Sequence, residues 1–250
     1  MELSLVILVV DALATPQESK LSPVTRNGSR LPLDGREWKA RGLNIYWLGL
    51  DENVTPPACR FQRQHGERQQ QPPDPAVLYE RHDSVGVQNY IQTLLTRRNA
   101  YNGLAYAEDP AIFTYETGNE LEGPASRDMD VPTDWIQDIA RLVKELAPEK
   151  LFIDGTYGIN ATHLDIDEVD IYSDHFYPVD TGKLWSDIKL VASSSQVFFA
   201  GDYDWRGQGG DPLETFYRVI EENPAAAGGA FWSLSGRNLS DCSVRALCPP

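Results

Sequence analysis

The sequence predicts an α/β fold of the (β/α)8 TIM-barrel type that is incomplete, with about six barrel strands in place of eight. Short apolar runs alternate with helical patterns, as they do in parallel sheets. Two of these runs end in carboxylates, as do strands that deliver catalytic groups to the mouth of a barrel. The chain has 250 residues, of which 41% are hydrophobic, so it is long enough to bury a core as one domain.

Six runs are expected to be strands because each is apolar or aromatic and lies between turn residues: 42–49, 111–117, 151–155, 169–176, 197–203 and 228–234. Apolar side chains at helical spacing predict helices around 85–95, 135–146 and 216–220. Pro132 and Thr133 stand where the second of these helices is expected to begin. Strand followed by helix, repeated, favours parallel pairing in a barrel or a doubly wound sheet.

One interval in this series is too long. The first expected strand begins at 42 and the second at 111, and a polar Gln/Pro-rich segment at 54–75 lies between them. Such a segment cannot offset the entropy of ordering by burying apolar area. We therefore expect one domain over 21–250 that lacks two to three strand and helix units, at about 30 residues per unit.

Composition excludes several classes of partner. A net charge of -15 and a pI near 4.6 oppose nucleic acid and anionic membranes. No run after the N-terminal segment approaches the length of a membrane span. The three cysteines, Cys59, Cys242 and Cys248, form no CxxC motif, and no paired histidine spacing occurs, so we expect no metal site and no cofactor.

The N-terminal residues 1–20 are expected to be a signal peptide or its remnant. An apolar centre at 3–10 precedes Ala12-Leu13-Ala14, although Glu2 and Asp11 are atypical of a signal. The alternative is an arbitrary apolar start of the chain. Four Asn-x-Ser/Thr sequons, which matter only in the secretory route, begin at Asn27, Asn53, Asn160 and Asn238. We expect a secreted, extracellular monomer.

Two separate strands present carboxylates where they end. The run 111–117 leads into Asn119 and Glu120, and the run 197–203 carries Asp202, with Asp204 just beyond it. Glu116 is expected to lie on the side of its strand opposite to Glu120 and to have a structural role. Paired carboxylates on different strands are the groups that cleavage of a glycosidic bond needs.

Seven blocks of the chain, in order, are similar to one known family: TRNGSRLPLDG (25–35), GLNIYWLGLDEN (42–53), ETGNE (116–120), IDGTYG (153–158), DIYSDHFYP (170–178), GDYDW (201–205) and FWSL (231–234). Together they resemble the fungal endo-β-1,4-mannanase type of glycoside hydrolase family 5, which comprises retaining (β/α)8 barrels. The resemblance extends over about residues 24–236.

The resemblance implies a role for each of several residues. Glu120 would be the general acid/base, and Asp202 stands where the family has its nucleophile. Residues implied to bind or position the substrate are Asn119, His175, Tyr177, Trp232, Trp47 and Asn44. The substrate would be β-mannan or a related polysaccharide, and the chemistry needs no cofactor.

The chain departs from the family at two places. The units after the first strand have no counterpart, and the family's nucleophilic Glu is replaced by Asp202. Asp is one methylene shorter, so its oxygens withdraw by about 1 Å, and misplacement on that scale costs about a hundredfold in rate. We expect β-1,4-mannosidase activity that is impaired. The alternatives are an inactive carbohydrate-binding pseudoenzyme or fragment, and an endo-β-1,4-glucanase.

Overall fold

A computed structural model of the chain describes residues 22–44, 81–122, 131–206 and 209–232. Its main sheet has six parallel strands in the order β3-β8-β7-β6-β5-β4. The strands are β3 (Ala40–Leu43), β4 (Thr114–Glu116), β5 (Leu151–Asp154), β6 (Ile171–Phe176), β7 (Val197–Tyr203) and β8 (Ala226–Phe231). All six correspond to the runs expected from the sequence, although most are shorter than predicted.

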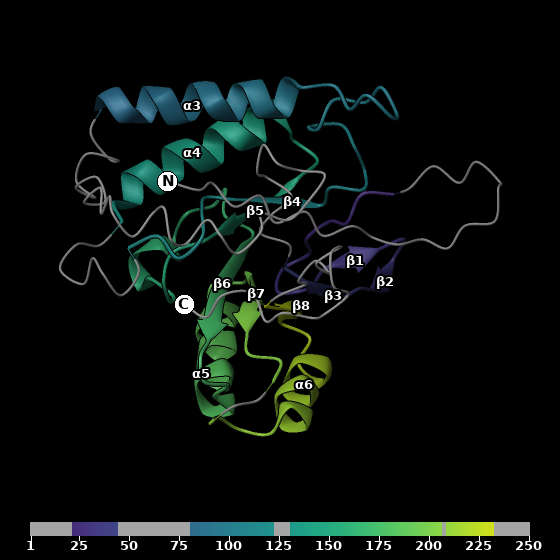
Figure 1. Ribbon diagram of the computed structural model, residues 1–250, viewed down its shortest axis with the longest axis vertical. Coiled ribbons are helices and arrows are strands. Elements are labelled where there is room, and N and C mark those ends of the chain that lie inside the picture. Colours follow the sequence, from purple (N-terminus) through teal and green to yellow (C-terminus); the bar gives the residue numbers. More distant parts are fainter. Residues whose placement is uncertain (1–21, 45–80, 123–130, 207–208, 233–250) are drawn as a thin grey trace, which may run out of the picture.

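The strand order is that of a barrel with a gap. Consecutive strands from β4 to β8 are neighbours, and the first strand of the sheet, β3, pairs with the last, β8, as in a closed barrel. Within the described residues, the sheet is open between β3 and β4, which is where the sequence lacks strand and helix units. Figure 1 shows the resulting curled sheet. The prediction of an incomplete (β/α)8 barrel is therefore confirmed.

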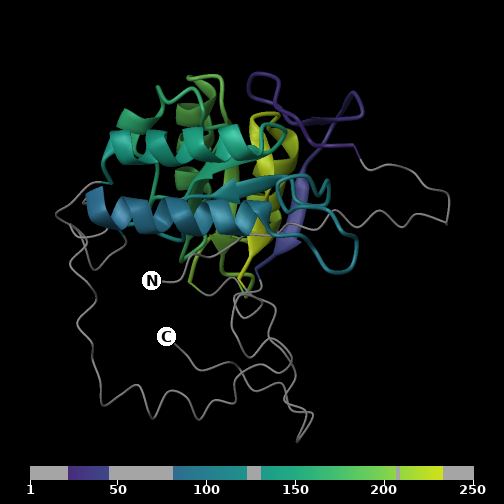
Figure 2. The same cartoon turned by 90° about the horizontal axis from the view of Figure 1, so that it is seen from above.

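Helices cover the outer face of the sheet. They are α3 (Arg81–Thr96), α4 (Thr133–Leu146), α5 (Thr181–Ala192) and α6 (Leu213–Glu222), with a short 3-10 helix η3 (Ala161–His163). Helices α3 and α4 lie side by side near β4 and β5, whereas α5 and α6 pack behind β7 and β8 (Figures 1 and 2). In the described part of the chain, no helix is long and apolar enough to cross a membrane.

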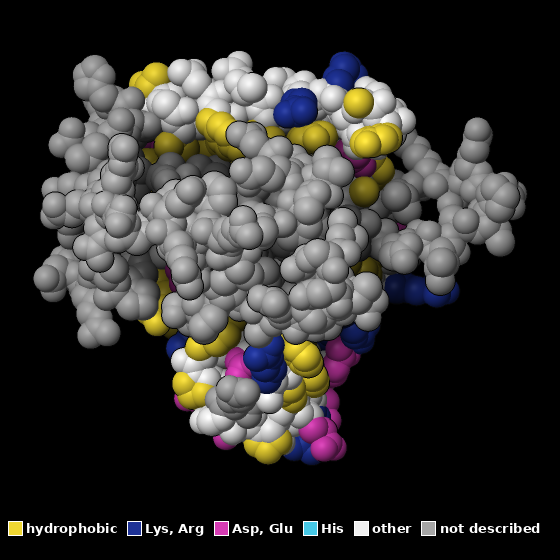
Figure 3. All heavy atoms as spheres, in the orientation of Figure 1, with side chains coloured by type: hydrophobic (Ala, Val, Ile, Leu, Met, Phe, Trp, Pro, Cys, Tyr) yellow, Lys and Arg dark blue, Asp and Glu magenta, His cyan; other side chains and the backbone are white. Residues whose placement is uncertain are grey.

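One helix, α5, was not predicted from the sequence. Its buried side chains Leu184, Ile188 and Val191 recur at steps of four and three residues, which is helical spacing. The side chain of Asp180 caps the helix by accepting a hydrogen bond from the Lys183 amide. In Figure 3, the lower lobe formed by α5 and α6 carries hydrophobic and charged side chains next to each other.

The core has two parts, one on each face of the sheet. The outer part lies between the strands and the helices and includes Tyr172, Phe198 and Phe216. The inner part is made of residues near the beginnings of the strands, such as Leu151, Ile171 and Val197, together with Leu31. Next to it, Trp38 packs edge-on against Phe113, with ring centroids 5.2 Å apart.

A small antiparallel ribbon completes this end of the barrel. It consists of β1 (Pro32–Leu33) and β2 (Arg36–Glu37), and both Leu33 and Trp38 pack against the inner core. The N-terminal ends of the strands are thus filled with apolar side chains. Those polar residues predicted to be functional that the structure describes lie at, or just beyond, the opposite, C-terminal ends of the strands.

Candidate active site

Glu120 lies just beyond the end of β4 and contacts His175 of β6. The Nδ1 atom of His175 is 2.7 Å from Oε1 of Glu120. The backbone of Glu120 has a φ of 50°, a left-handed conformation that residues other than glycine adopt rarely. Strain of this kind concentrates at functional sites, because the surrounding structure must maintain it.

Asp202 lies on β7, directly beside His175 in the register of the two parallel strands. Its Oδ1 accepts a hydrogen bond from the hydroxyl of Tyr177, which follows β6. A Cβ atom on Gly201 would lie 3.1 Å from Nε2 of His175, so the absence of a side chain there leaves room for the imidazole. Of the two predicted catalytic carboxyls, Glu120 therefore contacts His175 and Asp202 contacts Tyr177.

The protonation of these groups follows from burial and from their contacts. The hydrogen bond with His175 is the main cause that lowers the pKa of Glu120. Burial opposes a charge on His175, but the hydrogen bond to Glu120 and the nearby carboxylates raise its pKa overall. Burial raises the pKa of Asp202 to about 6, although the Tyr177 hydroxyl favours its ionised form. Burial and the Asp202 charge both raise the pKa of Tyr177.

These shifts are opposite to those that a retaining glycosidase needs at the moment of attack. In that mechanism the nucleophile is ionised and the acid/base is protonated. Here the pKa of Asp202 is raised and that of Glu120 is lowered. The reason for the second shift is that Glu120 and His175 share one proton, which resides on the imidazole when the two form an ion pair.

The structure also locates the residues predicted to bind substrate. Asn119 is exposed beside Glu120. Trp232 follows β8 with 39% of its surface exposed, and its backbone pairs with that of Asp204. Asn44 follows β3, and its amide nitrogen donates to the backbone oxygen of Gly201 at 3.0 Å. Trp47 lies outside the described residues. Substrate binding by these residues remains a prediction.

Glu116 does not face away from the site, contrary to the prediction. Its Oε1 accepts a hydrogen bond of 2.9 Å from Oγ of Ser173, and its charge interacts with those of His175 and Asp202. Burial raises its pKa to about 7. The prediction was wrong because alternation along a strand places residues four apart on the same side, and Glu116 and Glu120 are four residues apart. Its even spacing from Glu120 in ETGNE was the available signal.

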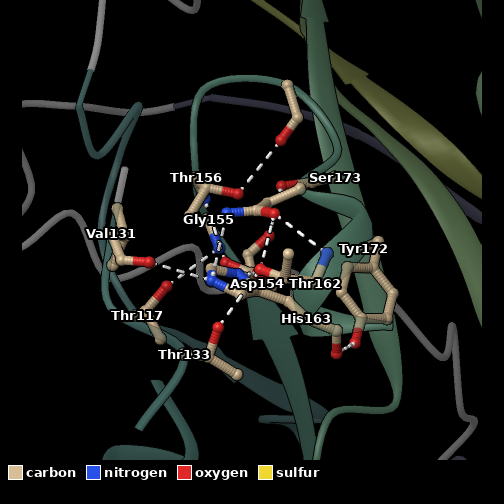
Figure 4. Close-up of polar contacts among 12 residues, drawn as sticks. Thr117, Val131, Thr133, Asp154, Gly155, Thr156, Thr162, His163, Tyr172 and Ser173 are labelled. Atoms are coloured by element: carbon tan, nitrogen blue, oxygen red, sulfur yellow. Dashed lines mark hydrogen bonds and ion pairs between the residues drawn. The ribbon is translucent and has the colours of Figure 1, made fainter. Parts of the chain in front are cut away.

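A buried polar cluster adjoins Ser173 at the end of β5 (Figure 4). The Nδ1 atom of His163 is 2.7 Å from Oδ2 of Asp154, and both side chains are fully buried. The other ring nitrogen lies 3.0 Å from the Val131 oxygen, and the Tyr172 hydroxyl donates to the backbone oxygen of His163. This cluster joins the segment 154–163 to β6 and to the start of α4. It is a structural support of the site.

Metal binding has no support in the described part of the chain, where no group of three or more His, Cys, Asp or Glu side chains could hold an ion. The functional groups of the site are three carboxyls, those of Glu116, Glu120 and Asp202, together with the imidazole of His175 and the phenol of Tyr177. This set can transfer protons and attack an electrophilic carbon.

Comparison with known proteins agrees with the geometry. Mannan endo-1,4-beta-mannosidase 1 of Solanum lycopersicum is 24% identical over 199 residues, which cover 62% of this chain and 50% of the relative. Mannan endo-1,4-beta-mannosidase 1 of Arabidopsis thaliana is 34% identical over 73 residues, or 28% of this chain and 18% of the relative. The chain thus spans half or less of these curated relatives. Both are plant proteins, so the fungal character of the resemblance remains a prediction.

The fold has a counterpart among solved structures. An endo-1,4-beta-D-mannanase from Thermotoga petrophila superposes with a TM-score of 0.56 at 16% identity, over 67% of this chain and 58% of that protein. Residues 36–189 match the family described as GH family 5 beta-mannosidase-like. Because this match extends over more than half of the 250 residues, the chain belongs to that family.

Proposed function

We propose that this protein is a secreted glycoside hydrolase that cleaves β-1,4-mannosidic bonds in mannans by a retaining mechanism. The observation that carries the proposal is the junction at His175, which contacts Glu120 after β4 and lies beside Asp202 on β7. It brings two carboxyls from separate strands to the C-terminal end of the sheet. That is where barrel enzymes of this type hold their catalytic groups.

The mechanism uses the two carboxyls in turn. Asp202, once ionised, attacks the anomeric carbon and forms a glycosyl ester, while the proton of the His175 and Glu120 pair passes to the departing oxygen. Glu120 then takes a proton from water, which hydrolyses the ester and restores Asp202. The Tyr177 hydroxyl stabilises the ionised form of Asp202 before attack.

The substrate class is supported by the relatives. The two plant relatives are named as mannan endo-1,4-beta-mannosidases, and the structural counterpart is named as an endo-1,4-beta-D-mannanase. Trp232, which remains partly exposed at the end of β8, offers an aromatic face against which a sugar ring could stack.

The decisive experiment restores the length of the nucleophile. Purified full-length chain and its Asp202→Glu, Asp202→Asn and Glu120→Gln variants are assayed for reducing sugar released from mannan and glucomannan. We expect Asp202→Glu to raise kcat/KM by about a hundredfold over the native chain. The other two variants should lack activity, and Glu145→Gln, on the exposed face of α4, is the matched control.

Proton NMR of the first product then gives the stereochemistry. Retention of the anomeric configuration supports an ester on residue 202, whereas inversion contradicts the mechanism. If the compact Asp202→Glu protein releases no sugar from either polymer, the proposed hydrolase activity is wrong.

A second function is favoured by the shortened Asp202 and the open barrel, namely binding of the sugar without cleavage. Calorimetric titration with a mannooligosaccharide distinguishes it from the first. This second function is supported if the native chain binds the mannooligosaccharide and neither the native chain nor Asp202→Glu cleaves it. Parallel assays on mannan and a soluble cellulose derivative separate a mannanase from an endo-β-1,4-glucanase.

A further inference from the structure

Three carboxyl groups surround His175, although the mechanism uses only two of them. Glu120 contacts Nδ1 of the imidazole, and Asp202 lies beside it on the neighbouring strand. Glu116 is the third, and its charge interacts with those of His175 and Asp202. Because Glu116 precedes Glu120 by four residues, one segment of the chain supplies two of the three carboxyls.

The position of Glu116 is fixed by its surroundings. Its Oε1 accepts a hydrogen bond of 2.9 Å from Oγ of Ser173, two residues before His175 on β6. A Cβ atom on Gly155 would lie 2.9 Å from the same oxygen and 1.9 Å from the backbone oxygen of Gly118. The carboxyl therefore occupies a space that only a glycine at position 155 leaves open.

We propose that Glu116 is a positioning residue whose carboxylate keeps the shared proton on the pair formed by His175 and Glu120. The effect of Glu116 on catalysis rests on the proposed function. Its effect on the pKa of His175 does not. The proton of the pair is the one that passes to the glycosidic oxygen. A negative charge close to His175 retains that proton to a higher pH.

The charges around Glu116 agree with this role. Burial raises its pKa to about 7, His175 and the Ser173 hydroxyl favour its ionised form, and Asp154 and Asp202 oppose it. Around His175, burial opposes the positive charge, while Glu120, Asp202 and Glu116 all favour it. Glu116 is therefore ionised above about pH 7, where its charge acts on the imidazole.

The test measures the titration of His175 directly. Full-length protein labelled at histidine Cε1 is followed by NMR across pH, and the His175 resonance is assigned by its loss in His175→Gln. We expect Glu116→Gln to lower the pKa of His175 by about one pH unit, since it removes a nearby negative charge while keeping the shape. Glu145→Gln, on the exposed face of α4, should leave it unchanged.

Two further variants separate charge from packing. Glu116→Asp keeps the charge, so it should return the His175 pKa most of the way to the native value. Ser173→Ala removes the hydrogen bond that favours ionised Glu116, so it should lower the His175 pKa by a smaller amount than Glu116→Gln does. A merely structural role would make Glu116→Asp and Glu116→Gln behave alike.

Kinetics give the catalytic part of the answer. In the Asp202→Glu background, Glu116→Gln should move the alkaline limb of kcat/KM to lower pH by about one unit, in step with His175. An unchanged His175 pKa in a folded Glu116→Gln protein overturns the inference, whatever the activity. A shifted pKa in a protein without activity on any mannan upholds the role of Glu116 and instead rejects the proposed function.

Discussion

The Nδ1 atom of His175 lies 2.7 Å from Oε1 of Glu120, which joins β6 to the segment after β4 across the mouth of the sheet. Strand β5 separates β6 from β4 in the sheet order. The contact therefore spans two strand spacings and depends on the curl of the sheet. The imidazole and the carboxyl form one unit that binds a proton.

Replacing His175 should change both the pKa of Glu120 and the rate of proton transfer. In His175→Ala, the pKa of Glu120 should rise, because the hydrogen bond with His175 is the main cause that lowers it. Loss of a positioned proton-transfer group should reduce kcat by about a hundredfold. The pH dependence of kcat on mannan measures both effects. Lys189→Ala, on the exposed face of α5, is the control, and equal losses in the two variants would contradict the prediction.

Tyr177→Phe should affect the acidic side of the pH profile. The Tyr177 hydroxyl donates to Asp202 and lowers its pKa, which burial nevertheless raises to about 6. Without the hydroxyl the pKa of Asp202 should rise further, so the acid limb of kcat/KM should move to higher pH. Tyr101→Phe is a matched control because Tyr101 is fully exposed. An acid limb that is the same in both variants would show that the phenol does not act on Asp202.

Stability should fall as the pH rises from about 4 to about 8, because buried Glu116 must ionise in the folded protein. Its pKa is raised from 4.5 to about 7, so its contribution is complete below 4.5 and is lost as the pH rises through 7. Glu116→Gln removes this loss, so we expect the unfolding free energy of the variant to fall by about 3 kcal/mol less than that of the native protein. Asp202 loses its own contribution at a lower pH, between 3.8 and about 6.

Urea unfolding of both proteins at about pH 4 and about pH 8 measures the difference. Glu145→Gln again serves as the exposed control. If the native protein and Glu116→Gln change in parallel between these two pH values, Glu116 does not ionise in this range.

Asp170, at the other end of β6, should matter for stability and not for catalysis. Its carboxylate pairs with Arg26 at 2.9 Å and with Lys144, and it accepts a hydrogen bond of 2.9 Å from the Phe152 amide. Asp170→Asn leaves two part-buried cations without their counter-ion, so we expect a loss of about 3 kcal/mol in unfolding free energy.

The ion pair of Arg141 and Glu168 is the control for this prediction. The side chain of Arg141 is 56% exposed and that of Glu168 is 24% exposed, so Glu168→Gln should cost no more than about 1 kcal/mol. Urea midpoints and m-values give both numbers. The kcat of Asp170→Asn should equal that of the native chain at a temperature where both are folded, because Asp170 precedes β6 and the site lies at the other end of that strand.

The sequence by itself predicted the incomplete parallel barrel, which the structure confirms, and it supplied the two carboxyls whose catalytic role is proposed here. Apolar runs at near-regular intervals specify strands and helices because burial requires that periodicity. The long interval after the first strand specified the gap, and the pairing of β3 with β8 agrees with it. Helix α5 was not predicted because its apolar stripe is short, although the spacing of its buried residues is helical.

Tertiary structure alone decided how the polar groups pair. The contact of His175 with Glu120, the hydrogen bond from Tyr177 to Asp202 and the approach of Glu116 to Ser173 join residues 25 to 57 positions apart. No periodicity along the chain encodes such distances. They depend on sheet curvature, on the irregular register beside His175 and on the space left at Gly155. Burial and these contacts together then set the pKa values, because both are properties of the folded surroundings and not of the residue type.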